Sequence, residues 1–420
     1  MDPLLCSVAT RDEAIIPAQP VSIIGEPLDS GSCARIDLWP FPRTSLTYPM
    51  TATRFPKVFS AGRIGNVRLK NRTIVAPMTR TSATVDGRAT PIMVDYYAEF
   101  ARNDWGLIIA EATYIDKQYS QGYNNQPGIA DDAHRDAWRP VIEACHRAGT
   151  PIFLQLIHAG AVNQGNHWIK GSIAPSSVQP KGQQIDRYGG EGPFQVPREI
   201  TRDEIRQSAA NFAAAAKRAA DAGFDGIEVH GANGYLLDQF LTTYTNLRGD
   251  EYGGAIENRV RFHTEVMKAV RDAVPAQVPV GVRISQTKVN DLTYVWPGGV
   301  NDANIVFPAL QRTGIDFIHV SAHLGCTPVF DSGMSLAALA KRATGMTIIA
   351  NGKLNDPVLA EAALTNGDGD FCAIGKGALA DPAWPVKIQQ GATPIPFDPA
   401  MTSPLATVAN TAAWRSRRAA

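Results

Sequence analysis

Residues 201–230, TRDEIRQSAANFAAAAKRAADAGFDGIEVH, predict one helix followed by one strand, and this unit decides the fold. Thr201 and Glu204 have the spacing of a capping box, which marks the start of a helix. Apolar residues then recur at helical spacing as far as Gly223, a residue type that commonly ends helices. The run from Gly226 to His230 is short and rich in β-branched residues, which is typical of a parallel strand buried on both faces.

Seven similar apolar runs occur elsewhere, separated by segments with helix signals. A helix is expected at about 257–273, and another at about 356–365, where Asp356 and Pro357 have the order of an N-cap and a first helical residue. The pattern predicts a single α/β domain, a (β/α)8 TIM barrel with a short N-terminal hairpin and a long loop after strand 3. A doubly wound open sheet is the alternative, weakened because no GxGxxG follows any run. The predicted strands are 73–77, 107–111, 152–156, 226–230, 280–284, 316–320, 346–350 and 371–375.

The two ends of the chain differ from this pattern. Residues 1–55 are rich in Pro, Ser and Thr and lack periodicity, so we predict a disordered leader. The alternative is a leader that is not native to the protein, with translation beginning at Met50. The barrel is expected to occupy 56–395, followed by a C-terminal tail, 396–420.

The charge balance bears on the class of partner. The 420 residues include 40 Lys and Arg and 40 Asp and Glu, for a formal net charge of zero at pH 7. Because no block of one sign occurs, we expect a small-molecule substrate, no nucleic acid and no membrane surface as partner. No stretch of about 20 apolar residues occurs, so no membrane span is expected. The sequence leaves the oligomeric state, monomer or homodimer, open.

The cysteines carry a negative prediction. They are scattered and form no CxxC pair, which disfavours a disulfide framework and a cysteine-ligated zinc or iron–sulfur site. We therefore expect free thiols, no metal and a cytoplasmic protein. The cysteines are Cys6, Cys33, Cys145, Cys326 and Cys372.

Polar residues gather where the predicted strands end. In a parallel barrel the working groups lie at the carboxyl ends of the strands and in the loops that follow them. The long connection 158–200 carries Trp168, Tyr188 and Phe194, which we expect to shape the pocket. The candidate site residues at the strand ends are Thr79, Ala112, Gln155, His230, Asn233, Tyr235 and Arg283.

The segment 229–237, VHGANGYLL, suggests a particular chemistry. His230 and Asn233 can donate two convergent hydrogen bonds to one oxygen, an arrangement that stabilises developing negative charge. Tyr235, a phenol, can deliver a proton to carbon. The alternative is a buried histidine bonded to the backbone, with the tyrosine packed as core.

The stretch 223–261 resembles the signature of the Old Yellow Enzyme family. It contains GFDGIEVHGANGYLLDQFL and, further on, the family string N-x-R-x-D-x-Y-G-G … E-N-R. The likeness also covers 71–80 (NRTIVAPMTR), 153–160 (FLQLIHAG), 197–201 (PREIT) and 374–382, and spans about 55–390. The residues that reproduce the string are Asn246, Arg248, Asp250, Tyr252, Gly253, Gly254, Glu257, Asn258 and Arg259.

The resemblance implies an FMN-dependent oxidoreductase that passes a hydride from NAD(P)H through the flavin to an activated alkene. His230 and Asn233 would bind the substrate oxygen, and Tyr235 would protonate the α-carbon. The barrel would then be an FMN-binding domain. In the family's pattern, Thr79 lies beside flavin O4; Pro77, Met78 and Ala112 line the ring; Gln155 and Arg283 bind the pyrimidine edge; and Gly352, Gly375 and Lys376 are the phosphate residues.

One departure affects the phosphate end, and several functions stay open. The family's Gly-Arg reads Gly375-Lys376 here, which keeps the charge and loses the bidentate fork, although Lys353 could compensate. An FMN enzyme could instead catalyse dehydrogenation, isomerisation or nitro reduction. A non-catalytic ligand-binding barrel is the alternative from another class. The sequence identifies neither the physiological substrate nor the choice between NADH and NADPH.

Overall fold

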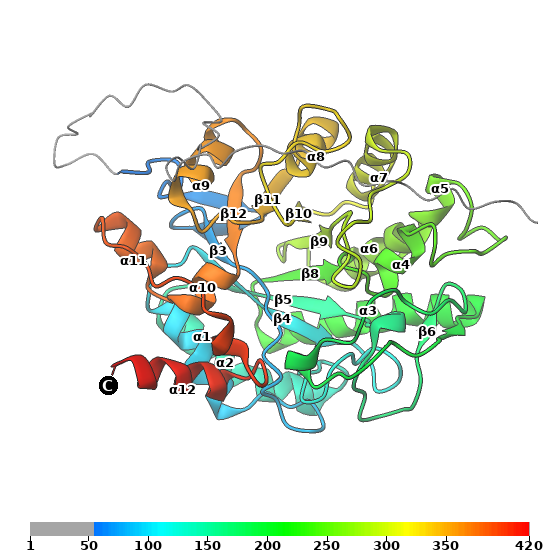
Figure 1. Cartoon of the computed structure of the whole chain (residues 1–420), viewed down its shortest axis with the longest axis horizontal. Helices are drawn as coiled ribbons and strands as arrows, with labels where there is room; N and C mark the ends of the chain where they lie inside the picture. The colour runs from blue at the N-terminus through cyan, green and yellow to red at the C-terminus, as the bar shows by residue number, and fades with distance from the viewer. Residues whose placement is uncertain (1–53, 420) are drawn as a thin grey trace, which may run out of the picture. The chain divides into compact units, whose positions relative to one another are not determined.

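The computed structural model describes residues 54–419. The predicted leader, 1–55, therefore lies outside the described residues except for its last two. Eight parallel strands form a closed barrel in sequence order, which confirms the predicted TIM barrel and excludes the open sheet (Figure 1). The strands are β3 (Thr73–Val75), β4 (Leu107–Tyr114), β5 (Ile152–Ile157), β8 (Gly226–His230), β9 (Val280–Ile284), β10 (Phe317–Ser321), β11 (Thr347–Asn351) and β12 (Phe371–Ile374).

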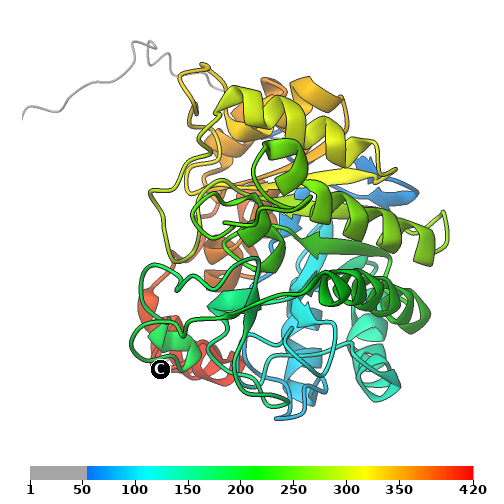
Figure 2. The same ribbon diagram turned by 90° about the vertical axis from the view of Figure 1, so that its right-hand side faces the viewer.

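Helices cover the outside of the barrel. Three of them, α3, α6 and α7, face the viewer in Figure 2. The predicted capping box is present, because Thr201 Oγ1 accepts from the Glu204 N–H (3.2 Å) and the Glu204 carboxylate accepts from the Thr201 N–H (2.9 Å). The helix predicted at 257–273 is divided at Val260. The barrel helices are α1 (Pro91–Ala101), α2 (Asp132–Arg147), α3 (Arg202–Ala222), α4 (Leu236–Leu241), α5 (Ile256–Arg259), α6 (Arg261–Ala273), α7 (Val300–Gln311), α8 (Leu336–Thr344), α9 (Pro357–Thr365) and α10 (Lys376–Ala380).

The predicted N-terminal hairpin closes one end of the barrel. It consists of β1 (Gly62–Ile64) and β2 (Val67–Leu69), which pair antiparallel. Ile64 and Leu69 are buried in one apolar cluster with side chains of the barrel strands. The hairpin turn lies against Pro279 and Asp316, which immediately precede β9 and β10. Because the amino-terminal end is filled in this way, a ligand must enter at the carboxyl ends of the strands.

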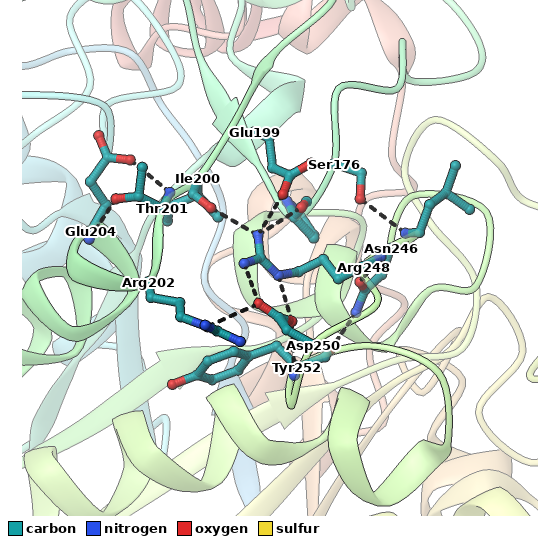
Figure 3. Close-up of polar contacts among 12 residues, drawn as sticks. Ser176, Glu199, Ile200, Thr201, Arg202, Glu204, Asn246, Arg248, Asp250 and Tyr252 are labelled. Atoms are coloured by element: carbon teal, nitrogen blue, oxygen red, sulfur yellow. Dashed lines mark hydrogen bonds and ion pairs between the residues drawn. The ribbon is translucent and has the colours of Figure 1, made fainter.

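The long connection after β5 contains η1 (Gly160–Val162), β6 (Ile173–Ala174), η2 (Asp186–Tyr188) and β7 (Arg198–Glu199). Arg248, from the family string, holds this connection in place (Figure 3). Its guanidinium donates to both carboxylate oxygens of Asp250 (2.9 and 2.6 Å) and to the carbonyls of Ile200 (2.8 Å) and Pro175 (3.1 Å). This part of the string therefore supports the wall of the barrel mouth.

The C-terminal segment contains α11 (Trp384–Gln389), η3 (Pro399–Thr402) and α12 (Val408–Ala419). Helix α12 lies against α1, where Arg415 pairs with Glu99 (2.7 Å). The buried Arg80 guanidinium donates to Thr407 O (2.7 Å) and Thr411 Oγ1 (2.5 Å). The segment predicted as a tail thus contacts the residue that directly follows Thr79.

Candidate active site

The carboxyl ends of β3, β9, β10, β11 and β12 surround a cavity of about 320 Å³. Asn351, His323 and Lys353 contribute to its wall. Six of the predicted cofactor residues also line it, and they come from strand ends far apart in the sequence. They are Pro77, Met78, Arg283, Gly352, Gly375 and Lys376.

The end of the cavity near β11 and β12 suits a phosphate. Gly352 has φ 132°, and a Cβ there would lie 2.5 Å from the Ala322 carbonyl oxygen, so only glycine fits. At Gly375 the nearest atom to an added Cβ would be Met78 Sδ at 3.7 Å, an ordinary van der Waals contact, and Gly375 also lines the cavity. Lys353 and Lys376 supply two positive charges to the same cavity.

Arg283 brings a buried cation to the opposite side. The guanidinium donates to Ser321 Oγ (3.1 Å), while its Nε is buried without a hydrogen-bond partner. Burial lowers the pKa of Arg283 and Glu228 opposes that shift, but an arginine side chain stays protonated in proteins. A buried, unpartnered N–H calls for an acceptor from a ligand. The carbonyl-bearing pyrimidine edge of FMN provides one, so the residues present fit FMN.

Gln155 lies on β5 beside Glu228 of β8 in the strand register. Its side chain is buried, and Nε2 donates to Glu228 Oε1 (2.7 Å). One amide N–H and the amide oxygen are left for a ligand.

His230, the last residue of β8, is held as a neutral donor. The Ala232 N–H donates to His230 Nδ1 (3.3 Å), so Nδ1 is an acceptor and Nε2 carries the proton. Burial, followed by the positive charge of Arg283, holds the pKa of His230 well below its usual value. A neutral imidazole with Nε2–H can donate to a substrate oxygen.

Asn233 occupies a left-handed turn with φ 63°, a conformation that asparagine tolerates better than most residues. Its N–H donates to Ser285 Oγ (2.8 Å), and its carbonyl accepts from the Val289 N–H (3.1 Å). These two backbone bonds fix the turn that carries the Asn233 side chain.

Tyr235 is the N-cap of α4 and lies against His230, with ring centroids 4.7 Å apart. Its hydroxyl is 2.5 Å from the hydroxyl of Tyr123. Burial is the main cause that raises the pKa of Tyr235 to about 12, and the hydrogen bond from Tyr123 partly opposes it. The phenol is therefore protonated near neutral pH and can act as an acid.

An apolar cluster surrounds this phenol. Tyr235, Ala112, Tyr123 and Phe194 are buried together in it, and Tyr188 packs against them. Phe194 and Tyr188, from the long connection, thus pack in the same cluster as this phenol. Trp168 instead packs against Tyr114 and His134, with ring centroids 6.5 and 6.4 Å away.

Thr79 is positioned through its neighbour. The Arg80 N–H donates to Glu111 Oε2 (2.8 Å), and Glu111 Oε1 accepts from the Tyr97 hydroxyl (3.2 Å). Burial raises the pKa of Glu111 to about 7, against the opposing effects of Arg80 and Tyr97. A carboxyl group inside the protein thus holds the backbone at Thr79.

Residue-by-residue reasoning missed four supporting groups: Tyr123, Glu111, Glu228 and His319. Glu111, Glu228 and His319 stand inside or at the end of apolar runs, and an ionisable residue in such a run is a signal that could have found them. Tyr123 lies in an irregular loop after β4, where no sequence pattern marks it.

Two negative predictions concern metals and membranes. Among residues 54–419, no group of three or more His, Cys, Asp or Glu is placed to hold a metal ion. Cys145, Cys326 and Cys372 are free thiols, and Cys6 and Cys33 lie outside the described residues. None of the helices in the described part has the length and apolar character to cross a membrane.

Two solved structures of old yellow enzymes have the same fold as this chain. The old yellow enzyme homologue from Zymomonas mobilis is 34% identical with a TM-score of 0.74, over 83% of this chain and 96% of that one. The old yellow enzyme from Trypanosoma cruzi is 30% identical with a TM-score of 0.75, over 85% of this chain and 97% of that one.

Curated relatives agree. The NADH oxidase of Thermoanaerobacter brockii is 36% identical over 351 residues, 81% of this chain and 52% of that protein. A Leishmania infantum protein named "Probable flavin mononucleotide-dependent alkene reductase" is 43% identical over 228 residues, 53% of this chain and 61% of that protein. The matched regions thus span about half and three fifths of these two relatives.

The predicted resemblance is therefore confirmed. Residues 57–394 match the NADH:flavin oxidoreductase / NADH oxidase family. With the closed barrel and its cavity, this match shows that the chain belongs to that family, whose cofactor is FMN.

Proposed function

We propose that this protein transfers a hydride from NAD(P)H, by way of FMN, to an activated alkene such as an α,β-unsaturated carbonyl compound. The observation that carries the proposal is the association of a neutral His230 with a protonated Tyr235, rings 4.7 Å apart, at the end of β8. Arg283, which lines the adjacent cavity, is the register partner of His230.

The cofactor would be held by the residues of this mouth. FMN, when bound, supplies the chemistry of accepting a hydride and passing it on. Gln155 and Arg283 would bind its pyrimidine edge, and Pro77, Met78, Thr79 and Ala112 would border its ring. Gly352 and Gly375 with Lys376 would hold the phosphate, and the cavity that these three residues line together supports that placement.

Hydrogen bonds would activate the substrate, and a proton transfer would complete its reduction. His230 Nε2–H and the Asn233 amide would donate to the substrate oxygen and stabilise negative charge as it develops there. The hydride adds to the β-carbon, and Tyr235 gives its hydroxyl proton to the α-carbon. The product is the saturated compound, and the tyrosine regains its proton from solvent through its surroundings.

Relatives support this reaction class. The Leishmania infantum relative is named an alkene reductase, and another solved neighbour, 32% identical with a TM-score of 0.73, is a morphinone reductase.

Anaerobic stopped-flow measurements on the purified, FMN-loaded protein test the proposal. NADH or NADPH should bleach the flavin absorbance, and an enone should restore it with formation of the saturated ketone. Restoration only by a nitro compound, or net dehydrogenation or isomerisation, would replace alkene reduction with one of the other FMN reactions. A protein that takes up no flavin from added FMN would instead be a non-catalytic barrel.

A further inference from the structure

A carboxylate lies within the barrel, directly below the proposed substrate site. Glu228 precedes His230 by two residues on β8, so both side chains face the same side of the strand, with Glu228 one layer deeper. It is fully buried and has two partners. Oε1 accepts from Gln155 Nε2 (2.7 Å), and Oε2 is 2.8 Å from His319 Nδ1.

Strand register explains how these groups meet. Gln155 on β5 is the direct register neighbour of Glu228. On the other side, β9 presents Gly281 at this level, which leaves Glu228 without a side-chain neighbour on that strand. Glu228 therefore reaches past β9 to His319 on β10. The network joins β5, β8 and β10.

Stability alone does not account for a carboxyl group in this position. Removing such a group from water is costly, and its hydrogen bonds serve mainly to offset that cost. Burial also lowers the pKa of His319, so the imidazole is neutral and donates from Nδ1. The Glu228 carboxyl group thus has a neutral partner at His319, and its electrostatic effect on Arg283 opposes the lowering of the pKa of that guanidinium.

The carboxylate determines which way the Gln155 amide faces. Glu228 Oε1 accepts from Gln155 Nε2, so the NH2 group of Gln155 faces Glu228. The amide oxygen of Gln155 therefore points away from Glu228. The pyrimidine edge of FMN carries an N–H between two carbonyl oxygens, and an amide oxygen is the acceptor that this N–H requires.

We propose that Glu228, supported by His319, is a positioning residue that orients Gln155 for FMN and tunes the reduction potential of the bound flavin by offsetting Arg283. The inference rests on the proposed placement of Gln155 and Arg283 at the pyrimidine edge. Glu228 touches neither substrate nor cofactor and acts through these two side chains.

The first test measures FMN affinity. Glu228→Gln keeps the volume of the side chain but can also donate, so the Gln155 amide is no longer held in one orientation. The apoprotein, titrated with FMN by fluorescence quenching, should bind about tenfold more weakly, the loss expected for one misdirected hydrogen bond. In a Gln155→Leu background the same substitution should change affinity less than about twofold, because coupled positions are not additive.

The second test measures the reduction potential of the bound flavin. Glu228→Gln removes the carboxylate and should raise the potential of bound FMN. His319→Leu removes a hydrogen bond that stabilises the carboxylate, so the potential should shift in the same direction but by less. For a two-electron couple, each tenfold change in the ratio of affinities for reduced and oxidised FMN corresponds to about 30 mV.

Asp316→Asn is the matched control. It replaces a carboxylate at the amino-terminal end of the barrel, where Asp316 pairs with Arg271 (3.0 Å), so affinity and potential should stay at wild-type values. An unchanged or lowered potential in Glu228→Gln would overturn the proposal. If Glu228→Gln does not fold, an unchanged or lowered potential in His319→Leu overturns it instead.

A different set of affinities would show that Gln155 and Arg283 are not placed at the pyrimidine edge of FMN. If Gln155→Leu and Arg283→Met each leave FMN affinity unchanged, these residues do not bind the flavin edge. The placement of FMN in the proposed function is then wrong. If both weaken FMN binding while Glu228→Gln does not, only the positioning role of Glu228 is wrong.

Discussion

The two ends of the proposed site are built from different kinds of chemical groups. The phosphate end, beside β11 and β12, uses glycine backbone and two lysines around an open cavity. The hydrogen-transfer end, at β8, uses buried imidazole and phenol groups whose pKa values are shifted by burial. The difference shows where each physical effect is useful. Solvated charge can bind an anion, whereas a group that gives a proton in a defined direction needs a dry and rigid surrounding.

The largest effect is expected from Tyr235→Phe at the hydrogen-transfer end. The loss of the proton donor should slow the reoxidation of the enzyme by an enone about 10³-fold, within the range for general acids. FMN affinity and the rate of flavin reduction by NAD(P)H should stay unchanged. Single-turnover stopped-flow traces of the two half-reactions separate these steps. Equal rates of enone reduction in the variant and the wild type would remove Tyr235 from the proton-donor role.

The next effect concerns the buried support at Glu111. Its pKa is raised from 4.5 to about 7, so between these values the folded protein binds a proton that the unfolded chain does not. Stability from this group is therefore highest at low pH and is lost as pH rises through about 7, by about 3 kcal/mol in total.

Glu111→Gln cannot titrate, so its unfolding free energy should fall less than that of the wild type between pH 5 and pH 8. Urea unfolding at several pH values gives both curves, and their difference isolates Glu111 from the other groups that titrate. Parallel curves would show that its pKa is not raised in the folded protein.

Substitutions at the phosphate end should change only the affinity for FMN. Lys376→Ala removes one of two cations and should weaken FMN binding about tenfold, near 1.4 kcal/mol. Lys376→Arg restores the family's residue and should tighten binding, because a guanidinium can bind a phosphate in bidentate fashion. Titration of the apoproteins measures both. A Lys376→Ala variant with normal affinity but slow enone reduction would remove the distinction between the two ends.

The smallest effect should come from Tyr123→Phe. The hydroxyl of Tyr123 bonds that of Tyr235 at 2.5 Å and partly offsets the rise in its pKa. Without it the pKa of Tyr235 should rise further, and enone reduction should slow about fivefold, a little under 1 kcal/mol. Single-turnover rates measured with the enone give this value. An unchanged rate would mean that the contact only packs the two rings.

Residue patterns predicted the architecture because they are local. The strand Gly226–His230 begins and ends as predicted, and the helix before it starts at the predicted capping box. The order of eight strands with helices between them leaves few closed arrangements. The predicted helix at 257–273 is interrupted at Val260, a boundary that periodicity alone does not mark.

The site could be predicted only as a set of positions. Sequence determined that His230, Asn233 and Tyr235 follow one strand, and that Gly352 and Gly375 follow two others. Only the tertiary structure decided that Tyr123 meets Tyr235 and that Glu228 reaches His319 past Gly281. These contacts join strands and loops up to 112 residues apart, and hydrogen bonds over such separations depend on how the barrel closes, which no short stretch of sequence encodes.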